Sequence, residues 1–303
     1  MKQVLQTPVL LIAFNRPGLV LQSLQLLQQV QPKRLYIALD GPRNGNATDA
    51  QKIKEIKIAI AFIPWKCRVQ ILEQKKNMGC GRGPVKAMDW FFSHEKEGII
   101  LEDDIQPDTS FFFFCEELLQ RYRNNKQIAA ISGSNYLPPA LRKKESYYFS
   151  RFTHTWGWAT WRRVWKQYDF HISDWELSKK AIFERFSSFF DRWYWYMKFE
   201  SIHKKRFGSV WDYQWTYLCL KHHMCSIIPR QNLVSNIGVG TEATHTQTIH
   251  ARLQANIIPM HFPLTHPKAI VISTEADRFI QLQNYVFWKG LVVYIAQFFG
   301  FMR

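Results

Sequence analysis

The sequence has no internal repeat or low-complexity tract between its halves, and no segment is a clean transmembrane helix. Glycine and proline are scarce, 14 and 13 of 303 residues, and 47% of the residues are hydrophobic, which excludes a disordered or fibrous chain. Cysteine is also rare: five residues stand at irregular spacings, and no signal segment precedes them. We therefore expect a reduced, cytoplasmic protein rather than a disulfide-stabilised one.

Acidic residues are few as well, and 24 Asp and Glu against 40 Lys and Arg give a net charge of +16. This charge favours an anionic partner, which nucleic acid, anionic lipid or a phosphorylated substrate would supply. The basic residues are spread along the chain and no nucleic-acid-binding motif is present, so we do not expect nucleic acid as a partner. Aromatic residues are abundant instead, with 23 Phe and 12 Trp, and their faces suit sugar rings and membrane interfaces alike.

The C-terminal segment 285–302 is the nearest approach to a membrane segment. It is strongly apolar but contains one Lys, one Gln and two Gly, and its aromatic residues and terminal Arg303 are typical of an interfacial helix. A terminal helix packed on the domain explains the pattern equally well. We expect an apolar helix within 281–303, with peripheral contact at the inner face of the membrane as one of its two interpretations.

Strand and helix patterns alternate through the first half of the chain. The expected strands are 9–14, 34–39, 68–72, 98–101 and 128–131; the expected helices are 19–30, 50–63, 84–92 and a helix from a Ser110 cap to about Asn124, with a glycine-rich loop at 77–83. This alternation predicts an α/β, Rossmann-like fold with a mainly parallel sheet flanked by helices. We expect one catalytic domain over 1–280, with a nucleotide-binding half at 1–135 and an acceptor half at 136–280.

Three consecutive acids, Glu102, Asp103 and Asp104, follow the apolar strand expected at 98–101. Carboxylates this close repel one another unless a cation or hydrogen bonds compensate. A divalent metal with oxygen ligands would do so and would also bridge to a diphosphate. Asn15 and Arg16 follow the first expected strand, and Asp40 follows the second. In parallel sheets of this kind, ligands bind beyond the carboxyl ends of the strands. An exposed acidic turn is the alternative.

Three motifs in order resemble the GT-A class of glycosyltransferases: PVLLIAFNRP at 8–17, DGPR at 40–43 and LEDDI at 101–105. Within that class they are similar to family 2-type bacterial enzymes and to the N-acetylglucosaminyltransferase that initiates complex N-glycans. The resemblance covers roughly residues 8–250. It implies transfer of a sugar from a nucleotide-diphosphate sugar, with a UDP-sugar favoured, to an acceptor hydroxyl. The motifs do not specify the sugar.

The resemblance also implies roles for the acids. The acidic triplet matches the DxD-type motif, so Asp104 would be the ligand of Mn²⁺ or Mg²⁺, and Asp103 would face the ribose or nucleotide side. Asp40 matches an acidic position that reads the base.

The donor nucleoside and phosphates have further candidate contacts. The resemblance implies that Phe14, Asn15 and Arg16 hold the nucleoside, and Arg16 is a fixed-charge fork donor suited to a phosphate, with a surface or capping arginine as the alternative. The glycine-rich loop precedes a helix, whose N-terminus favours anions. The corresponding loop of the family contacts the nucleotide-sugar, which implicates Asn77 and Arg82; a plain turn is the alternative.

The second half supplies the candidates for catalysis and acceptor binding. Asp212 stands among aromatics, where a raised pKa would suit a general base, and it resembles the WDxxW-like stretch that supplies the base in inverting relatives; a helix N-cap is the alternative. His245 resembles the loop histidine that is offered to metal or phosphate, and a surface histidine is nearly as plausible. Trp156 and Trp158 would stack on an acceptor sugar or pack in the core.

Taken together, the sequence favours an inverting, metal-dependent glycosyltransferase of bacterial-type surface glycan synthesis, acting on a glycan or lipid-linked acceptor. A sugar nucleotidyltransferase is one alternative, but such enzymes carry a glycine-rich basic loop after the first strand, and residues 13–17 contain no glycine. A non-catalytic nucleotide-sugar-binding or membrane scaffold protein is another, against which the intact acids Asp104 and Asp212 argue.

Overall fold

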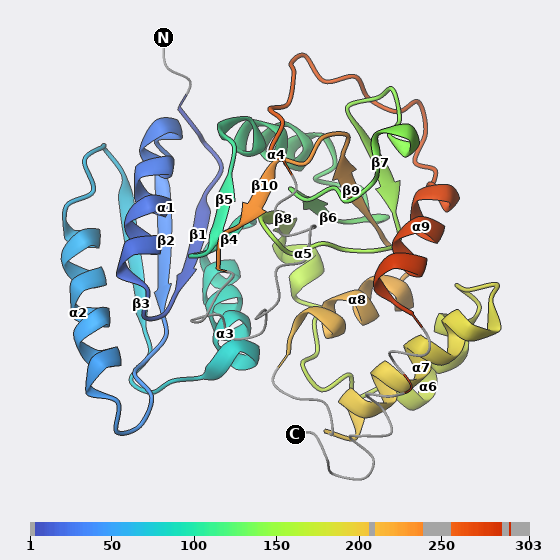
Figure 1. Ribbon diagram of the computed structural model, residues 1–303, viewed down its shortest axis with the longest axis horizontal. Coiled ribbons are helices and arrows are strands. Elements are labelled where there is room, and N and C mark those ends of the chain that lie inside the picture. The colour runs from blue at the N-terminus through green and yellow to red at the C-terminus, as the bar shows by residue number, and fades with distance from the viewer. Residues whose placement is uncertain (1–3, 206–209, 239–255, 287–290, 292–303) are drawn as a thin grey trace.

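The computed structural model describes residues 4–205, 210–238, 256–286 and 291 (Figure 1). The strands are β1 (Val9–Ala13), β2 (Arg34–Leu39), β3 (Arg68–Glu73), β4 (Glu97–Glu102), β5 (Ile105–Pro107), β6 (Ile128–Ser132), β7 (Tyr147–Ser150), β8 (Trp158–Trp161), β9 (Cys225–Pro229) and β10 (Val234–Asn236). Eight of them form the central sheet in the order β3-β2-β1-β4-β8-β6-β9-β7, and β10 pairs with β5 in a small antiparallel sheet.

The helices are α1 (Pro17–Val30), α2 (Ala47–Ala61), α3 (Gly79–His94), α4 (Thr109–Arg121), α5 (Arg162–Trp165), α6 (Trp175–Phe183), α7 (Phe189–His203), α8 (Asp212–Lys221) and α9 (Thr274–Asn284). Helix α1 contacts α2 and α4, whereas α3 contacts α5. In Figure 1, α1 lies in front of β2, and α6 and α7 lie at the lower right, far from the strands coloured blue.

The sheet confirms the Rossmann-like α/β class predicted from the alternating pattern. Strands β1, β2, β4 and β6 are apolar runs that are buried almost throughout, as expected for strands covered on both faces. Strands β1 to β4 pair in parallel, as do β6 and β9. The antiparallel pairings involve β7 and β8, both from the second half of the chain. Strands from both halves thus share one sheet.

A second hydrophobic core, separate from the one against the sheet, lies among α6, α7, α8 and α9. It is mainly aromatic, and Trp175 and Trp195 are completely buried in it. Aromatic side chains of this size remove more apolar area from water than any aliphatic residue, so a few of them can hold short helices together. Much of the unusual aromatic content of the sequence is therefore structural.

Two expected element boundaries were wrong. Helix α3 begins at Gly79, so most of the glycine-rich segment expected as a loop forms the first turns of the helix. Helix α4 is capped by Asp108, whose side chain accepts a hydrogen bond from the backbone N–H of Ser110, the residue expected to be the cap. Ser110 instead accepts a hydrogen bond from the backbone N–H of Met260 through its hydroxyl. In both cases a contact distant in sequence helps fix the local structure.

The C-terminal helix expected within 281–303 lies mostly outside the described residues, and α9, which ends at Asn284, precedes it. Among the described residues, no helix is long and apolar enough to span a bilayer. The division of the chain into nucleotide-binding and acceptor halves stays a prediction.

The cap of α4 gives a test of the local structure. Replacing Asp108 by Ala should lower the free energy of unfolding by about 1 kcal/mol, because the first turn of α4 loses its side-chain acceptor. Asp108→Asn should keep most of that stability, since an Asn side chain also accepts at the cap position. Denaturant unfolding of both variants measures the difference. Equal losses in the two variants would contradict a capping role.

Candidate active site

The strand register brings the predicted donor residues to one edge of the sheet. Ala13 lies opposite Leu39, and Ile12 lies opposite Glu102, so the segments that follow β1, β2 and β4 leave the sheet side by side. A cavity of about 720 Å³ opens at this edge. The predicted site residues that line it are Phe14, Asn15, Arg16, Asp40, Asn77, Asp103, Asp104 and Trp156.

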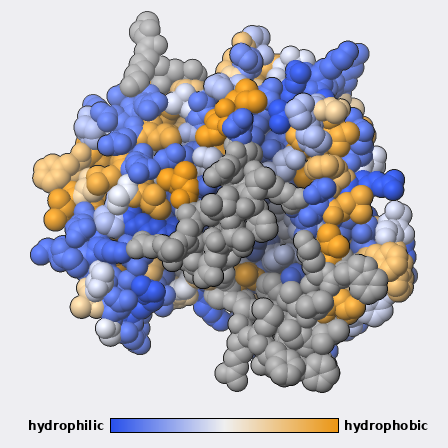
Figure 2. Space-filling model, in the orientation of Figure 1, coloured by the Kyte–Doolittle hydropathy of each residue, from blue (hydrophilic) through white to orange (hydrophobic). Residues whose placement is uncertain are grey.

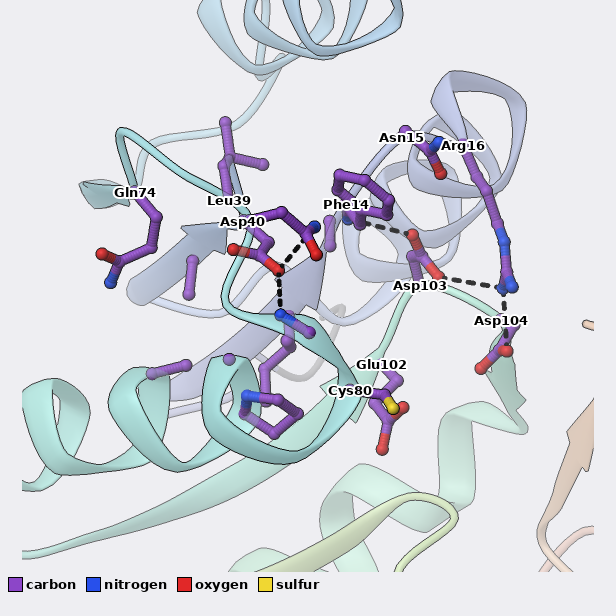
Figure 3. A pocket seen from close by; sticks show the side chains of 18 of the residues that line it. Phe14, Asn15, Arg16, Leu39, Asp40, Gln74, Cys80, Glu102, Asp103 and Asp104 are labelled. Carbon is purple, nitrogen blue, oxygen red and sulfur yellow. Dashed lines mark hydrogen bonds and ion pairs between the residues drawn. The ribbon is translucent and has the colours of Figure 1, made fainter. Parts of the chain in front are cut away.

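One end of the cavity is acidic (Figure 3). The Arg16 side chain reaches toward the acidic triplet, and its Nη1 lies 2.9 Å from Oδ2 of Asp104 and 3.5 Å from Oδ1 of Asp103. Asp103 is 7% exposed, and its backbone N–H donates to the Ile12 carbonyl. Asp104 is more open to the cavity, with 17% of its side chain exposed. Arg16 therefore contacts carboxylates here, and the phosphate contact expected of it stays a prediction.

The acids at this end are buried close to one another. Burial, followed by the charges of Asp104, Asp103 and Asp212, raises the pKa of Glu102 to about 8. Burial and the charge of Asp104 raise the pKa of Asp103 to about 7, although Arg16 lowers it. This cluster of carboxylate oxygens suits a divalent cation. Within the described ranges, however, no three His, Cys, Asp or Glu side chains form a group able to hold a metal ion.

The other predicted acid, Asp40, is bound to the start of α3. Its carboxylate oxygens accept hydrogen bonds from the backbone N–H groups of Met78 and Gly79 and from the side-chain amide of Asn77. Burial raises the pKa of Asp40, while these backbone donors lower it to a smaller extent. A carboxylate at a helix N-terminus is favoured by the helix dipole. Asp40 therefore holds α3 against the cavity, whether or not it also reads a base.

Two residues that the sequence analysis did not select, Arg43 and Asp49, fix the wall beside Phe14. Asp49 is 1% exposed, and its carboxylate accepts from Nε of Arg43 at 2.7 Å and from the side-chain amide of Asn15 at 2.7 Å. The Arg43 guanidinium lies 5.6 Å from the centre of the Phe14 ring and lines the cavity. Of these two residues, only Arg43 could have been selected from the sequence, because it belongs to the DGPR motif. Asp49 sits in an ordinary helical pattern.

Two expected contacts are not supported by the structure. Trp158 is 1% exposed and packs against Trp211 and Trp215, so it presents no face on which an acceptor sugar could stack. The core-packing alternative holds for this residue. Arg82 is exposed but does not line the cavity, and its guanidinium lies 5.1 Å from the centre of the Phe170 ring. The early start of α3 explains this position, because it places Arg82 within the helix rather than in a loop.

Asp212 lies outside the cavity lining but close to it. It is exposed, although Trp211 and Trp215 beside it are buried, and it is the first residue of α8 rather than its N-cap. Its negative charge contributes to the raised pKa of Glu102 and also acts on Lys198, whose pKa burial lowers to about 8. Asp212 therefore shares an electrostatic environment with both the acidic triplet and α7. His245 lies outside the described residues.

The small β5–β10 sheet brings a glycine onto Asp104. The backbone N–H of Ile237 donates to the Asp104 carbonyl, and a Cβ atom on Gly238 would overlap Oδ2 of Asp104. No side chain fits there unless Asp104 moves. Gly238 and Asn236 both line the cavity, so this close approach shapes its acidic end.

Comparisons with known proteins give no family. No protein-family model matches the chain, and no curated protein matches it in sequence. Among solved structures, HddC from Yersinia pseudotuberculosis is 10% identical with a TM-score of 0.34, covering 54% of this chain and 80% of that one. A UDP-glucose pyrophosphorylase complexed with UDP-glucose is 9% identical with a TM-score of 0.37, covering 74% and 90%. The inositol-1-phosphate CTP transferase from T. maritima is 10% identical with a TM-score of 0.30, covering 54% and 74%. At such low similarity we infer no activity from these structures.

The buried Asp49 carboxylate predicts a pH-dependent contribution to stability. Its hydrogen bonds with Arg43 hold its pKa well below the usual range, so the folded state binds the proton more weakly than the unfolded chain. The stabilisation is therefore complete above about pH 4, the ordinary aspartate range, and is lost as the pH falls toward the lower folded value. Asp49→Asn should cost roughly 1–3 kcal/mol at neutral pH.

Denaturant unfolding at a series of pH values tests this prediction. The gap between the wild type and Asp49→Asn should narrow below about pH 4. Glu55→Gln, on the exposed side of the same helix, is the matched control and should change stability little. A gap that stays constant with pH would show that the carboxylate charge is not what stabilises this wall.

Proposed function

We propose that this protein is a glycosyltransferase that moves a sugar from a nucleotide-diphosphate sugar, with a UDP-sugar favoured, to an acceptor hydroxyl, with inversion at the anomeric carbon. The observation that carries the proposal is the acidic triplet at the carboxyl edge of a Rossmann-like sheet, in a cavity about 720 Å³ in volume, with Asp212 electrostatically coupled to it. Such a cavity is of a size that holds a nucleotide-sized ligand. The role implied by the sequence resemblance agrees with this geometry.

The residues divide into donor-binding and reacting groups. The nucleoside would lie along Phe14, Asn15 and Asp40, and the diphosphate would lie at the acidic end, within reach of Arg16, which keeps further N–H donors besides those that face the acids. Trp156 lines the cavity and is the remaining aromatic candidate for acceptor stacking.

Asp212 is proposed as the general base. Its carboxylate would take the proton from the acceptor hydroxyl as that oxygen forms its bond to the anomeric carbon and the bond to the diphosphate breaks. It is exposed and therefore reachable by an acceptor. General-base catalysis of this kind contributes roughly 10²–10⁴-fold to the rate.

A divalent cation, Mn²⁺ or Mg²⁺, would be held by Asp104, with His245 as the second proposed ligand. Bound there, it would neutralise charge that develops on the departing diphosphate. Asp104 suits this role because its side chain is the more exposed of the two acids that contact Arg16.

A sugar nucleotidyltransferase is the second candidate, since it would need the same sheet, cavity and carboxylates. Against it stands the segment after β1, which carries Asn15, Arg16 and Pro17 in place of a glycine-rich loop and begins α1 at once. Incubation with a nucleoside triphosphate and a sugar 1-phosphate separates the two, because only a nucleotidyltransferase would release pyrophosphate.

Replacing Asp104 by Asn should abolish metal-dependent turnover of the nucleotide-sugar, because the cation loses its proposed carboxylate. Release of the nucleoside diphosphate is the measurement. Asp108→Asn is the matched control, since it keeps the α4 cap and lies outside the cavity lining. Undiminished turnover in Asp104→Asn would remove the metal-ligand assignment.

Asp212→Asn should bind the donor normally but turn over about two to four decades more slowly, because only proton removal is lost. Calorimetry of donor binding and single-turnover rates separate the two effects. Glu176→Gln, an exposed carboxylate on α6, should leave both unchanged. If Asp212→Asn instead weakened donor binding at an unchanged rate, it would be a binding residue.

A further inference from the structure

The first turns of α7 carry three large aromatic side chains that stand out from the surface. Phe189 is 63% exposed, Phe190 54% and Trp193 42%. The Phe189 ring lies 5.9 Å from that of Phe190 and 6.0 Å from that of Trp193, measured between ring centres. We call Phe189 and Trp193 the α7 aromatic patch. Figure 2 shows apolar surface at the lower right, in the region where Figure 1 places α6 and α7.

The patch is held rigidly by the aromatic core beneath it. The Trp193 ring lies 5.2 Å from that of Tyr196, one turn further along α7, and Tyr196 lies 5.8 Å from Phe183 and 5.9 Å from Trp175. The contacts therefore run without a break from the surface to a completely buried tryptophan. Trp193 is thus anchored to the core through Tyr196, and Phe189 packs against Trp193. Clustered exposed aromatics of this kind mark an interaction surface.

The charge of these two helices favours an anionic partner. The stretch 175–205, which contains α6 and α7, has seven Lys or Arg against four Asp or Glu, and without the largely buried Lys198 its net charge is +2. Arg192 is exposed beside Trp193, and Lys180 is exposed on α6, one turn before Phe183. A second copy would oppose this surface with the same positive charge. An anionic lipid surface complements it, since Phe and Trp rings enter the headgroup boundary while basic groups bind the phosphates.

We propose that the α7 aromatic patch docks the protein on an anionic lipid bilayer. The sequence suggested membrane contact through the C-terminal segment, whereas this surface belongs to the folded domain. Docking would also orient the candidate active site. Lys198 follows Phe189 by nine residues of helix, about 14 Å along the axis. The Lys198 ammonium lies 4.6 Å from the centre of the Tyr213 ring, and Tyr213 follows Asp212 in the sequence. If the proposed function is right, an acceptor linked to the bilayer would therefore be presented near the base.

Sedimentation with phosphatidylcholine vesicles, with and without phosphatidylglycerol, tests the docking in the absence of any nucleotide. The wild-type chain should bind the vesicles that contain phosphatidylglycerol at low ionic strength, and added salt should weaken the binding. Phe189→Ser with Trp193→Ser should lower the partition coefficient about tenfold or more. The matched control is Phe62→Ser, since Phe62 is 77% exposed at the end of α2, and it should bind like the wild type.

Thermal melting of the two single variants, Phe189→Ser and Trp193→Ser, checks that each remains folded, and each alone should weaken binding by a smaller factor. The proposal is overturned if the wild type does not bind the anionic vesicles, or if the patch variants bind as well as Phe62→Ser. It is also overturned if the patch substitutions convert a dimer into a monomer, because a second copy would then be the occupant. Nucleotide-sugar turnover without vesicles is unaffected by these outcomes, so the two proposals fail separately.

Discussion

Three acids, Glu102, Asp103 and Asp104, lie where β4 leaves the sheet. The residues around them are placed so that these neighbouring carboxyl groups can lie close together. Arg16 contacts Asp103 and Asp104, yet burial, followed by the neighbouring carboxylates, still raises the pKa values of Glu102 and Asp103. Two neighbouring segments accommodate these acids. Gly238 leaves room for the Asp104 side chain, and the backbone of Ile12 binds that of Asp103.

Two other carboxylates along the cavity also bind to backbone N–H groups or to basic and amide side chains. Asp40 accepts hydrogen bonds from the N-terminus of α3, and Asp49 holds Arg43 and Asn15 against Phe14. Each carboxylate thus orders a different wall of the cavity. The acidic end differs because three neighbouring acids there face one arginine. A site built for a cation and a diphosphate would have this imbalance.

The sequence predicted the parallel part of the sheet well, because β1, β2, β4 and β6 are short apolar runs whose ends carry turn and polar residues. The strand pattern also explains why residues 14–16, Asp40 and the acidic triplet lie at one edge of the sheet, whereas Arg82, Trp158 and Asp212 do not line the cavity. It could not predict the start of α3, which depends on Asp40 from 38 residues earlier in the chain. Nor could it assign Trp158 to the core or select Asp49, because burial and ion pairing between separate elements leave no local pattern.

The central claim is that the acidic cavity binds a nucleotide-diphosphate sugar together with a divalent cation. Thermal stabilisation by UDP-, GDP-, CMP- and dTDP-sugars, each with and without Mn²⁺, tests this most directly. A ligand that binds only the folded state raises its stability in proportion to the logarithm of its concentration over its Kd. We expect stabilisation by one nucleotide class, UDP-sugars first, and only with the metal present. If no nucleotide-sugar stabilised the protein under either condition, the cavity would not be a donor site, and a non-catalytic scaffold would become the better account.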